Sequence, residues 1–157
     1  MKNLFFYPSG LGKIGIAENG KAITNLYFQN EAIPQDAVIY ETDLLKEAGG
    51  QLQAYFSGKL RVFKLPLALG GTDFMRRVWQ SLQTIPYGET RSYQEIAQSI
   101  DNKKACRAVG QANNRNPIPI IIPCHRVIGA NGKLVGYGSG LGIKAKLLEL
   151  EKQYGDL

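Results

Sequence analysis

The sequence predicts an α+β protein in which a small strand-rich N-terminal domain precedes a mostly helical C-terminal domain. Short β-favouring runs separated by glycine turns occupy the beginning of the chain, and helical periodicity dominates the remainder. A connector at residues 60–71, with Pro66 and Gly70-Gly71, separates the two patterns. We therefore expect one domain at residues 1–66 and a second at residues 67–157.

The N-terminal domain is expected to contain a short antiparallel sheet. Its β-favouring runs lie at residues 4–7, 13–17 and 22–28. Ser9-Gly10 separates the first two runs, and Asn19-Gly20 separates the last two. An Asn-Gly pair between two such runs is a strong indication of a tight hairpin.

Two helices are expected, one on each side of the connector. Thr42 begins a stretch that ends at Ser57-Gly58, although Gly49-Gly50 lowers the helix propensity in its middle. Thr72 is placed to cap the second helix, whose apolar positions recur at helical spacing: Phe74, Met75, Val78, Trp79 and Leu82.

Two further short helices resemble a helix-turn-helix. Ser92 and Glu95 have the form of a capping box, and Asp101 or Asn102 is expected to end this helix and cap the next, at residues 103–114. The inner face of that next helix is predicted to carry Ala105, Ala108, Val109 and Ala112. Its outer face carries cations, amides and a glycine that suit phosphates and base edges, although an ordinary solvated face has the same composition: Lys103, Arg107, Gly110, Gln111 and Asn114.

Charge and composition limit the classes of function. Residues 1–66 carry 7 Lys and Arg against 6 Asp and Glu, a net charge of +1, whereas residues 67–157 carry 12 against 7, a net charge of +5. A basic half favours an anionic partner such as nucleic acid. Two cysteines and one histidine form neither a disulfide framework nor a conventional zinc site, so we expect reduced thiols and no metal. Neither a signal peptide nor a membrane span is expected.

The segment Pro117 to Val127 combines prolines, an apolar run and the adjacent pair Cys124-His125. Prolines restrict the backbone and set the geometry with which this pair enters the fold. A thiol becomes a good nucleophile as the thiolate, and a histidine can take its proton, here through a water. An inert buried cysteine beside an exposed histidine would show the same dipeptide.

The last helix supplies a third group. Its predicted apolar face contains Ile143, Leu147, Leu150 and Glu151. A carboxylate on such a face needs a partner, and His125 is the histidine available to it. Such a carboxylate would orient the ring, as in catalytic triads, whereas a solvated glutamate near the end of a helix would have no such role.

These segments together resemble the O6-alkylguanine-DNA alkyltransferases, also called methylated-DNA–protein-cysteine methyltransferases. Pro123-Cys124-His125-Arg126-Val127 resembles the active-site signature of the family, and Arg107-Ala108-Val109-Gly110 followed by Asn116-Pro117 resembles its recognition helix and the next turn. The resemblance extends over residues 52–152. It implies a ribonuclease-H-like N-terminal domain and a winged-helix-like C-terminal domain.

The resemblance also implies a role for each site residue. Cys124 accepts the alkyl group, His125 acts as the base through water, and Glu151 holds His125. Asn116 braces the turn before the active site, and Tyr93 assists the leaving guanine. Arg107 fills the vacated space in the base stack. The remaining contacts to DNA are expected from Ala108, Gly110, Ser92, Lys104, Gln111 and Arg126, and the guanine pocket from Val127, Tyr137, Gly138 and Ser139.

The implied activity is a single, irreversible transfer of an alkyl group from O6 of guanine, and from O4 of thymine, in flipped-out double-stranded DNA. No cofactor is implied, and a cytoplasmic monomer, associated with the nucleoid when bound to DNA, is expected. The family commonly has Tyr-Ser-Gly-Gly-Leu in its pocket loop, whereas this chain has Tyr137-Gly138-Ser139-Gly140-Leu141. The displaced serine leaves open which donor reaches O6 and which alkyl groups are accepted.

Three other functions share part of this pattern. A lesion-binding alkyltransferase-like protein lacks the nucleophilic cysteine, which is present here as Cys124. A helix-turn-helix regulator would carry an inert cysteine, and a thiol hydrolase built on Cys, His and Glu would need an oxyanion hole that no feature of the sequence requires. Stoichiometric transfer as opposed to turnover distinguishes these functions.

Overall fold

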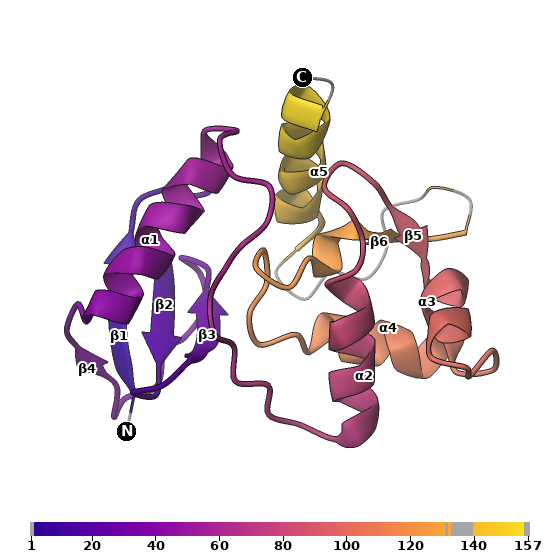
Figure 1. Cartoon of the computed structure of the whole chain (residues 1–157), viewed down its shortest axis with the longest axis horizontal. Coiled ribbons are helices and arrows are strands. Elements are labelled where there is room, and N and C mark those ends of the chain that lie inside the picture. The colour runs from indigo at the N-terminus through magenta and orange to yellow at the C-terminus, as the bar shows by residue number, and fades with distance from the viewer. Residues whose placement is uncertain (1, 131, 133–139, 156–157) are drawn as a thin grey trace. The chain divides into compact units, whose positions relative to one another are not determined.

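The computed structural model describes residues 2–130, 132 and 140–155. The chain divides into two compact units, Met1–Leu69 and Gly70–Leu157, and the division falls within the connector (Figure 1). The first unit contains a sheet and one helix, and the second is mostly helical. The predicted α+β class is thus confirmed.

The sheet of the first unit has four strands in the order β3-β2-β1-β4. β1 (Asn3–Tyr7), β2 (Ile14–Glu18) and β3 (Ile23–Tyr27) form the predicted antiparallel meander. The sheet is not wholly antiparallel, because β4 (Val38–Ile39) pairs with β1 in parallel. A strand of two residues carries too little alternation to be recognised in a sequence.

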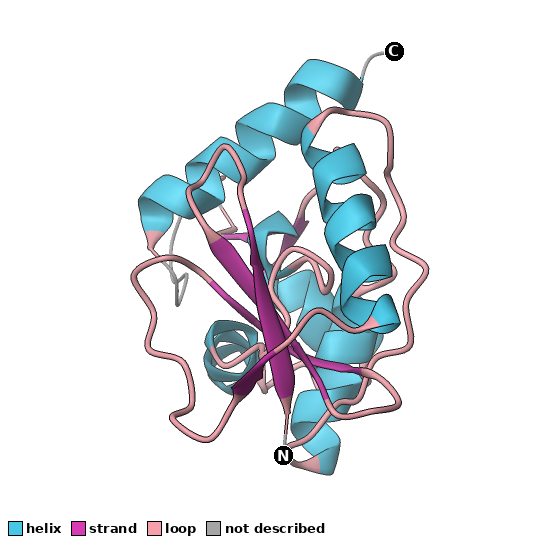
Figure 2. Cartoon of the chain, turned by 90° about the vertical axis from the view of Figure 1, so that its left-hand side faces the viewer, coloured by secondary structure: helices cyan, strands magenta, loops and turns pink. Residues whose placement is uncertain are grey.

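Glycine explains two local features of this unit. At the hairpin between β2 and β3, Gly20 has a φ of +94° and the Asn19 amide donates to the Ala22 carbonyl at 3.1 Å. In α1 (Asp43–Phe56), a Cβ on Gly49 would lie 2.4 Å from the Tyr7 ring. The glycine that weakens helix propensity therefore allows α1 to pack closely on the sheet (Figure 2).

The second unit begins with α2 (Asp73–Leu82), capped by Thr72, whose hydroxyl accepts from the Met75 amide. β5 (Arg91–Ser92) then leads into α3 (Tyr93–Ser99), and the predicted capping box between Ser92 and Glu95 is present. After α4 (Cys106–Asn114), a 3-10 turn η1 (Cys124–Arg126) precedes β6 (Val127–Ile128), which pairs with β5 in parallel. α5 (Leu141–Gly155) closes the unit.

The start of α4 differs from the prediction. The helix begins at Cys106 rather than at residue 103, and neither Asp101 nor Asn102 caps it. Asp101 instead adopts a φ of +57° and Asn102 donates to the Ala97 carbonyl, so both residues belong to the turn that ends α3. Lys103 lies in the next turn, which the Ala105 amide closes on the Asn102 carbonyl at 3.0 Å, and not on the helix.

No helix in the described part of the chain is long and apolar enough to cross a membrane. The apolar run before η1 is instead part of the core of the second unit, with Ile118, Ile120 and Ile122 all buried.

Candidate active site and DNA-binding face

The active-site turn is carried by a tightly bonded loop. The Ile122 amide donates to the Ile118 carbonyl at 2.9 Å. Asn116 fastens both ends of this loop, because its Nδ2 donates to the Ile122 carbonyl at 2.8 Å and its Oδ1 accepts from the Ile118 amide at 2.9 Å. Ile120 has a φ of +72°, a conformation that β-branched residues rarely adopt. Asn116 thus braces the segment that leads into Cys124.

Cys124 is the first residue of η1 and is 3% exposed. Asn113, buried on the inner side of α4, donates its Nδ2 to the Cys124 carbonyl at 3.3 Å. This bond links the helix of the predicted DNA-binding face to the backbone of the cysteine. Asn113 was not among the predicted site residues, although its spacing of four from the buried Val109 indicates that it faces inward.

His125 and Glu151 are brought together although 26 residues separate them. His125 Nε2 lies 2.6 Å from Glu151 Oε2, and the two side chains are 0% and 1% exposed. Burial lowers the pKa of His125, and the hydrogen bond that its ring donates to Glu151 only partly opposes that effect. Because the ring is neutral and Nε2 donates to the carboxylate, Nδ1 is the basic nitrogen. Within the described residues this buried Nδ1 has no hydrogen-bond partner.

Arg126 is a second partner of Glu151. Its Nε and Nη2 donate to Oε1 and Oε2 of Glu151 at 2.9 and 3.0 Å, and its Nη1 donates to the Ile85 carbonyl at 2.8 Å. The assignment of Arg126 to the DNA-binding residues was therefore wrong, because the guanidinium is buried and engaged inside the protein. The carboxylate of Glu151 is held by two neighbouring residues of η1.

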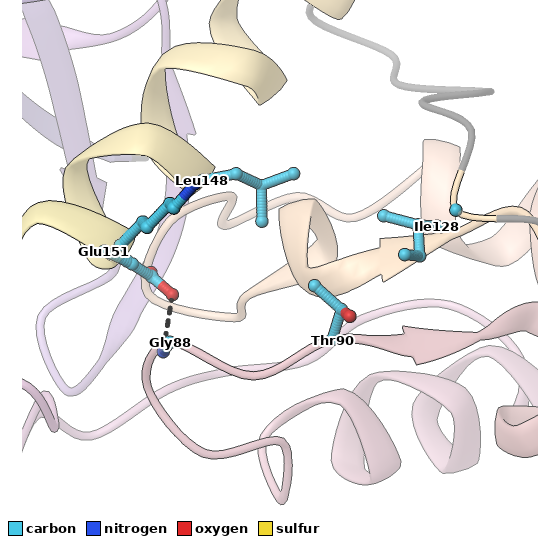
Figure 3. Close-up of a pocket in the computed structure, with 7 residues that line it drawn as sticks. Gly88, Thr90, Ile128, Leu148 and Glu151 are labelled. Atoms are coloured by element: carbon cyan, nitrogen blue, oxygen red, sulfur yellow. Dashed lines mark hydrogen bonds between the residues drawn. The ribbon is translucent and has the colours of Figure 1, made fainter. Parts of the chain in front are cut away.

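The surroundings of Glu151 keep it ionised. Burial by itself would raise the pKa of Glu151, but the hydrogen bonds and charges of His125 and Arg126 outweigh burial and hold the pKa well below its ordinary value. Gly88, whose φ is +79°, also donates its amide to Oε1 of Glu151 at 3.1 Å (Figure 3). A cavity of about 240 Å³ lies beside this contact, and its described lining includes Thr90, Ile128 and Leu148.

The buried side of α5 differs from the predicted apolar face. Lys144, Leu147 and Glu151 are its buried residues, whereas Ile143 and Leu150 are only half-buried. Lys144 is 0% exposed. Burial lowers the pKa of Lys144, and the charge of Cys124 opposes that shift. Lys144 was not predicted as a site residue, although its spacing of seven from Glu151 places both residues on one side of the helix.

Tyr93, the first residue of α3, is half-buried near Cys124. Burial raises the pKa of Tyr93, and the charges of Cys124 and Cys106 raise it further. A phenol with a raised pKa stays protonated and can donate a hydrogen bond at neutral pH. Cys106 and Cys124 are both free thiols.

The outer face of α4 exposes Arg107, Ala108, Gln111 and Asn114, and Lys104 is exposed in the preceding turn. Ala108 was also predicted on the inner face, which was wrong. Gly110 is half-buried and faces α3, since a Cβ there would lie 3.8 Å from the Tyr93 ring, so it is not an open part of the surface. The Ser92 hydroxyl accepts from the Glu95 amide and caps α3.

The remaining predicted pocket residues are only partly described. Val127 is buried at the start of β6, directly after η1. Tyr137, Gly138 and Ser139 lie outside the described residues. In the described ranges, no group of three or more His, Cys, Asp and Glu side chains is arranged to hold a metal ion.

The arrangement has the elements of a thiol nucleophile with an oriented base. A cysteine adjoins a neutral histidine, an ionised glutamate orients that histidine, and a buried ammonium and a tyrosine lie near the sulfur. An exposed helix face with an arginine and amides lies on the other side of the helix that holds the cysteine backbone.

Comparison with known proteins agrees with this arrangement. The model of the 6-O-methylguanine DNA methyltransferase DNA-binding domain matches residues 73–153, and that of the ribonuclease-like domain matches residues 5–69. The chain is 56% identical over 148 residues to a methylated-DNA–protein-cysteine methyltransferase of Methanosarcina barkeri, covering 92% of this chain and 93% of that protein. The protein of the same name from Mycobacterium leprae is 53% identical over 146 residues, covering 92% and 88%.

The fold is similar as well. The crystal structure of Mycobacterium tuberculosis OGT in complex with DNA matches with a TM-score of 0.91 and 49% identity, covering 97% of this chain and 94% of that one. The ribonuclease-like N-terminal domain expected from the resemblance is confirmed. The chain belongs to the methylated-DNA–protein-cysteine methyltransferase family.

Proposed function

We propose that this protein repairs DNA directly, by moving an alkyl group from O6 of guanine in double-stranded DNA onto Cys124. The observation that carries the proposal is the hydrogen bond between His125 and Glu151, at 2.6 Å. His125 directly follows the buried Cys124 in the chain. An inert buried cysteine needs no base that is oriented by an ionised carboxylate. The name of the relatives supports the same reaction.

The chemistry follows from the protonation states. Neutral His125 takes the thiol proton of Cys124 at Nδ1, through a water, while Glu151 accepts from Nε2 and stabilises the imidazolium that forms. The thiolate then attacks the saturated carbon of the alkyl group. The sulfur–carbon bond forms as the carbon–O6 bond breaks, and Tyr93 donates a hydrogen bond to the leaving guanine. A thioether is inert, so each molecule reacts once.

The DNA-binding part of the proposal rests on the exposed side of α4. Arg107, Gln111 and the nearby Lys104 present donors to phosphates and bases, and Ala108 adds little bulk between them. The reacting guanine must leave the base stack before O6 is accessible, and Arg107 fills the space it leaves. Repair at O4 of thymine, a monomeric state and a cytoplasmic location belong to the same proposal.

Intact mass spectrometry tests the proposed function. The protein is mixed with an excess of an oligonucleotide duplex carrying O6-methylguanine, and peptides are then mapped. We expect one methyl group per protein, on Cys124, with no further product over time. Methylation of Cys106 instead would overturn the assignment of the nucleophile. Release of product beyond one equivalent would indicate a hydrolase or another turnover enzyme.

A further inference from the structure

Two buried acceptors lie beside the reactive cysteine without a protein donor in the described part of the chain. One is Oδ1 of Asn113, a side chain that is 1% exposed. The other is Nδ1 of His125, whose ring is 0% exposed. Buried polar atoms of native proteins nearly always have a hydrogen-bond partner, so each of these two atoms calls for a donor.

The amide of Asn113 faces the cysteine in a fixed sense. Its partner, the Cys124 carbonyl at 3.3 Å, only accepts hydrogen bonds, so the nitrogen must face that carbonyl and Oδ1 must lie on the other side of the amide. The same carbonyl also accepts from the Val127 amide, the bond that closes η1. Because the carbonyl has a donor without Asn113, satisfying it does not by itself explain a buried amide at this position.

The two acceptors lie beside the same peptide group. The Cys124 carbonyl belongs to the peptide that joins this residue to His125, and the Asn113 amide is bonded to it. In the imidazole, Nδ1 is the nitrogen nearer to the backbone, while Nε2 at the far end of the ring lies 2.6 Å from Glu151. Two acceptors cannot bond each other. A water, which has two O–H donors, satisfies both.

We propose that Asn113 is a positioning residue for the thiol proton, because its Oδ1 holds the water through which Cys124 passes that proton to His125. The inference rests on the proposed function for the need to ionise Cys124. The water donates one hydrogen to Oδ1 and the other to Nδ1, so its oxygen is left to accept from the thiol. When the S–H bond breaks, the water takes the thiol proton and gives its own proton to Nδ1. The sulfur becomes a thiolate, the ring becomes an imidazolium, and the water is regenerated.

The role assigned to Asn113 concerns the ionisation of Cys124 and not the attack that follows, so its effect depends on pH. Near neutral pH, the thiol needs His125 to take its proton. Above the ordinary thiol pKa of about 8.5, the sulfur ionises without this relay. A substitution that merely displaced the sulfur would instead slow transfer by the same factor at every pH.

Single-turnover transfer from free O6-benzylguanine measures this effect, because a free base does not depend on contacts between α4 and DNA. Asn113→Leu keeps a side chain of similar size and removes both hydrogen-bonding groups. It should slow transfer by about tenfold or more at about pH 7 and by less than about threefold at about pH 10. An equal loss at both pH values would overturn the proposal.

Two further variants control for packing. Asn114→Leu, exposed on the same helix, is the matched control and should transfer at the native rate at both pH values. Asn113→Met removes the same groups with an unbranched side chain, which irregular core gaps accept more readily, and should repeat the pH dependence of Asn113→Leu. Native-rate transfer by Asn113→Met near neutral pH would contradict the role of the amide.

Labelling histidine with ¹⁵N tests the contact itself by NMR, because His125 is the single histidine of the chain. Its two ring resonances report Nδ1 and Nε2 separately in unreacted protein. Asn113→Leu should move the Nδ1 resonance to higher frequency, as an unprotonated nitrogen does when it loses a hydrogen bond. The Nε2 resonance should keep the signature of a protonated nitrogen bonded to Glu151. An Nδ1 resonance that does not move would show that Asn113 holds no water on this ring.

Cys124→Ala distinguishes the water from the thiol as the donor to Nδ1. If Asn113 holds the water, this variant should move the Nδ1 resonance much less than Asn113→Leu does. A larger movement in Cys124→Ala would mean that the thiol donates to the ring directly, which would overturn the proposal. Failure of the native protein to acquire an alkyl group on Cys124 would contradict the proposed function, while the ring resonances would still decide where Asn113 acts.

Discussion

The two units bury glutamates of nearly equal exposure but use them differently. In the first unit, Glu18 accepts from two neutral donors, the Asn3 side chain of β1 at 2.8 Å and the Gly20 amide of the β2–β3 hairpin at 3.0 Å. In the second unit, Glu151 binds Arg126 and the titratable ring of His125. Two buried carboxylates of the same chain thus serve, respectively, a turn and a reactive centre.

The comparison extends to the remaining buried charges. Among the described residues, Glu18 is the buried charged side chain of the first unit, whereas the second unit buries Arg126, Lys144 and Glu151, together with the neutral ring of His125, within η1 and α5. Burying charge opposes stability unless each group is paired. The difference places the electrostatic cost of burial at η1, the turn that contains Cys124, and at the helix packed against it.

The largest effect is expected at the sulfur itself. Cys124→Ser should abolish alkyl transfer, because a serine hydroxyl is a much weaker nucleophile than a thiolate, and should leave binding to lesion-containing duplex intact. Single-turnover transfer and fluorescence anisotropy measure the two properties. Cys106→Ser is the control and should transfer normally, and loss of transfer in that variant would show that both thiols are needed.

The next largest effect on transfer is expected at Glu151, with the buried Glu18 of the first unit as its control. Glu151→Gln should slow single-turnover transfer by about 10²–10⁴-fold, because His125 loses the carboxylate that orients it and stabilises its charged form. Glu18→Gln keeps a hydrogen-bonding side chain at the hairpin and should transfer at the native rate. Native-rate transfer by Glu151→Gln would mean that the buried glutamate is structural in both units.

The melting temperature of Glu151→Gln should depend on pH less strongly in acid than that of the native protein. Since His125 and Arg126 outweigh burial and hold the pKa of Glu151 below its ordinary value of 4.5, the carboxylate contributes its full stability above that value. The contribution is lost as the pH falls through 4.5 towards the lower pKa of the folded state. The advantage of the native protein over Glu151→Gln in melting temperature should therefore narrow in acid.

A smaller effect is expected at the exposed face of α4. Arg107→Ala should slow repair of duplex DNA by about tenfold while sparing transfer from free O6-benzylguanine, because a free base needs no flipping and leaves no space to fill. The two single-turnover rates are measured side by side. Gln111→Ala, on the same exposed face, tests whether loss of any polar contact suffices. Equal losses on both substrates would place Arg107 in the chemical step instead.

The smallest effect on transfer is expected in the first unit. Leu4→Ala removes a fully buried side chain of β1 and should lower the free energy of unfolding by about 2–5 kcal/mol. Transfer by the folded protein should nevertheless proceed at the native rate. Chemical denaturation and a transfer assay at a temperature well below melting measure the two quantities. A slowed transfer step in the folded variant would show that the units are coupled.

The sequence predicted elements where a local rule was strong and failed where the outcome depended on packing. Thr72 and the Ser92–Glu95 box cap their helices as expected, since a capping interaction involves only residues close in sequence. Asp101 and Asn102 have the same chemistry, yet they complete the turn after α3. A capping residue can serve either neighbouring helix, and tertiary structure decides which.

In the site as well, local patterns were predictable and contacts that depend on packing were not. The spacing of Glu151 on its helix and the single histidine of the chain left a solvated glutamate open, and the family resemblance led us to expect the pair that the structure contains. The sequence pattern did not reveal that Arg126 turns inward, because an arginine beside a nucleophile in a DNA-binding protein is equally suited to phosphate. Lys144 was missed because a lysine is by default placed in solvent.

One feature of α4 limits how such proteins can diverge. Arg107 and Gln111 are exposed on one side of this short helix, while Asn113 on its other side holds the Cys124 carbonyl, and the Trp79 indole donates to the Ala112 carbonyl at 2.9 Å. The helix that we propose contacts the duplex is therefore bonded directly to the peptide group of Cys124, the proposed nucleophile. Substitutions that tilt α4 to favour another sequence context would also move the sulfur, so preference for context and reactivity should change together during evolution.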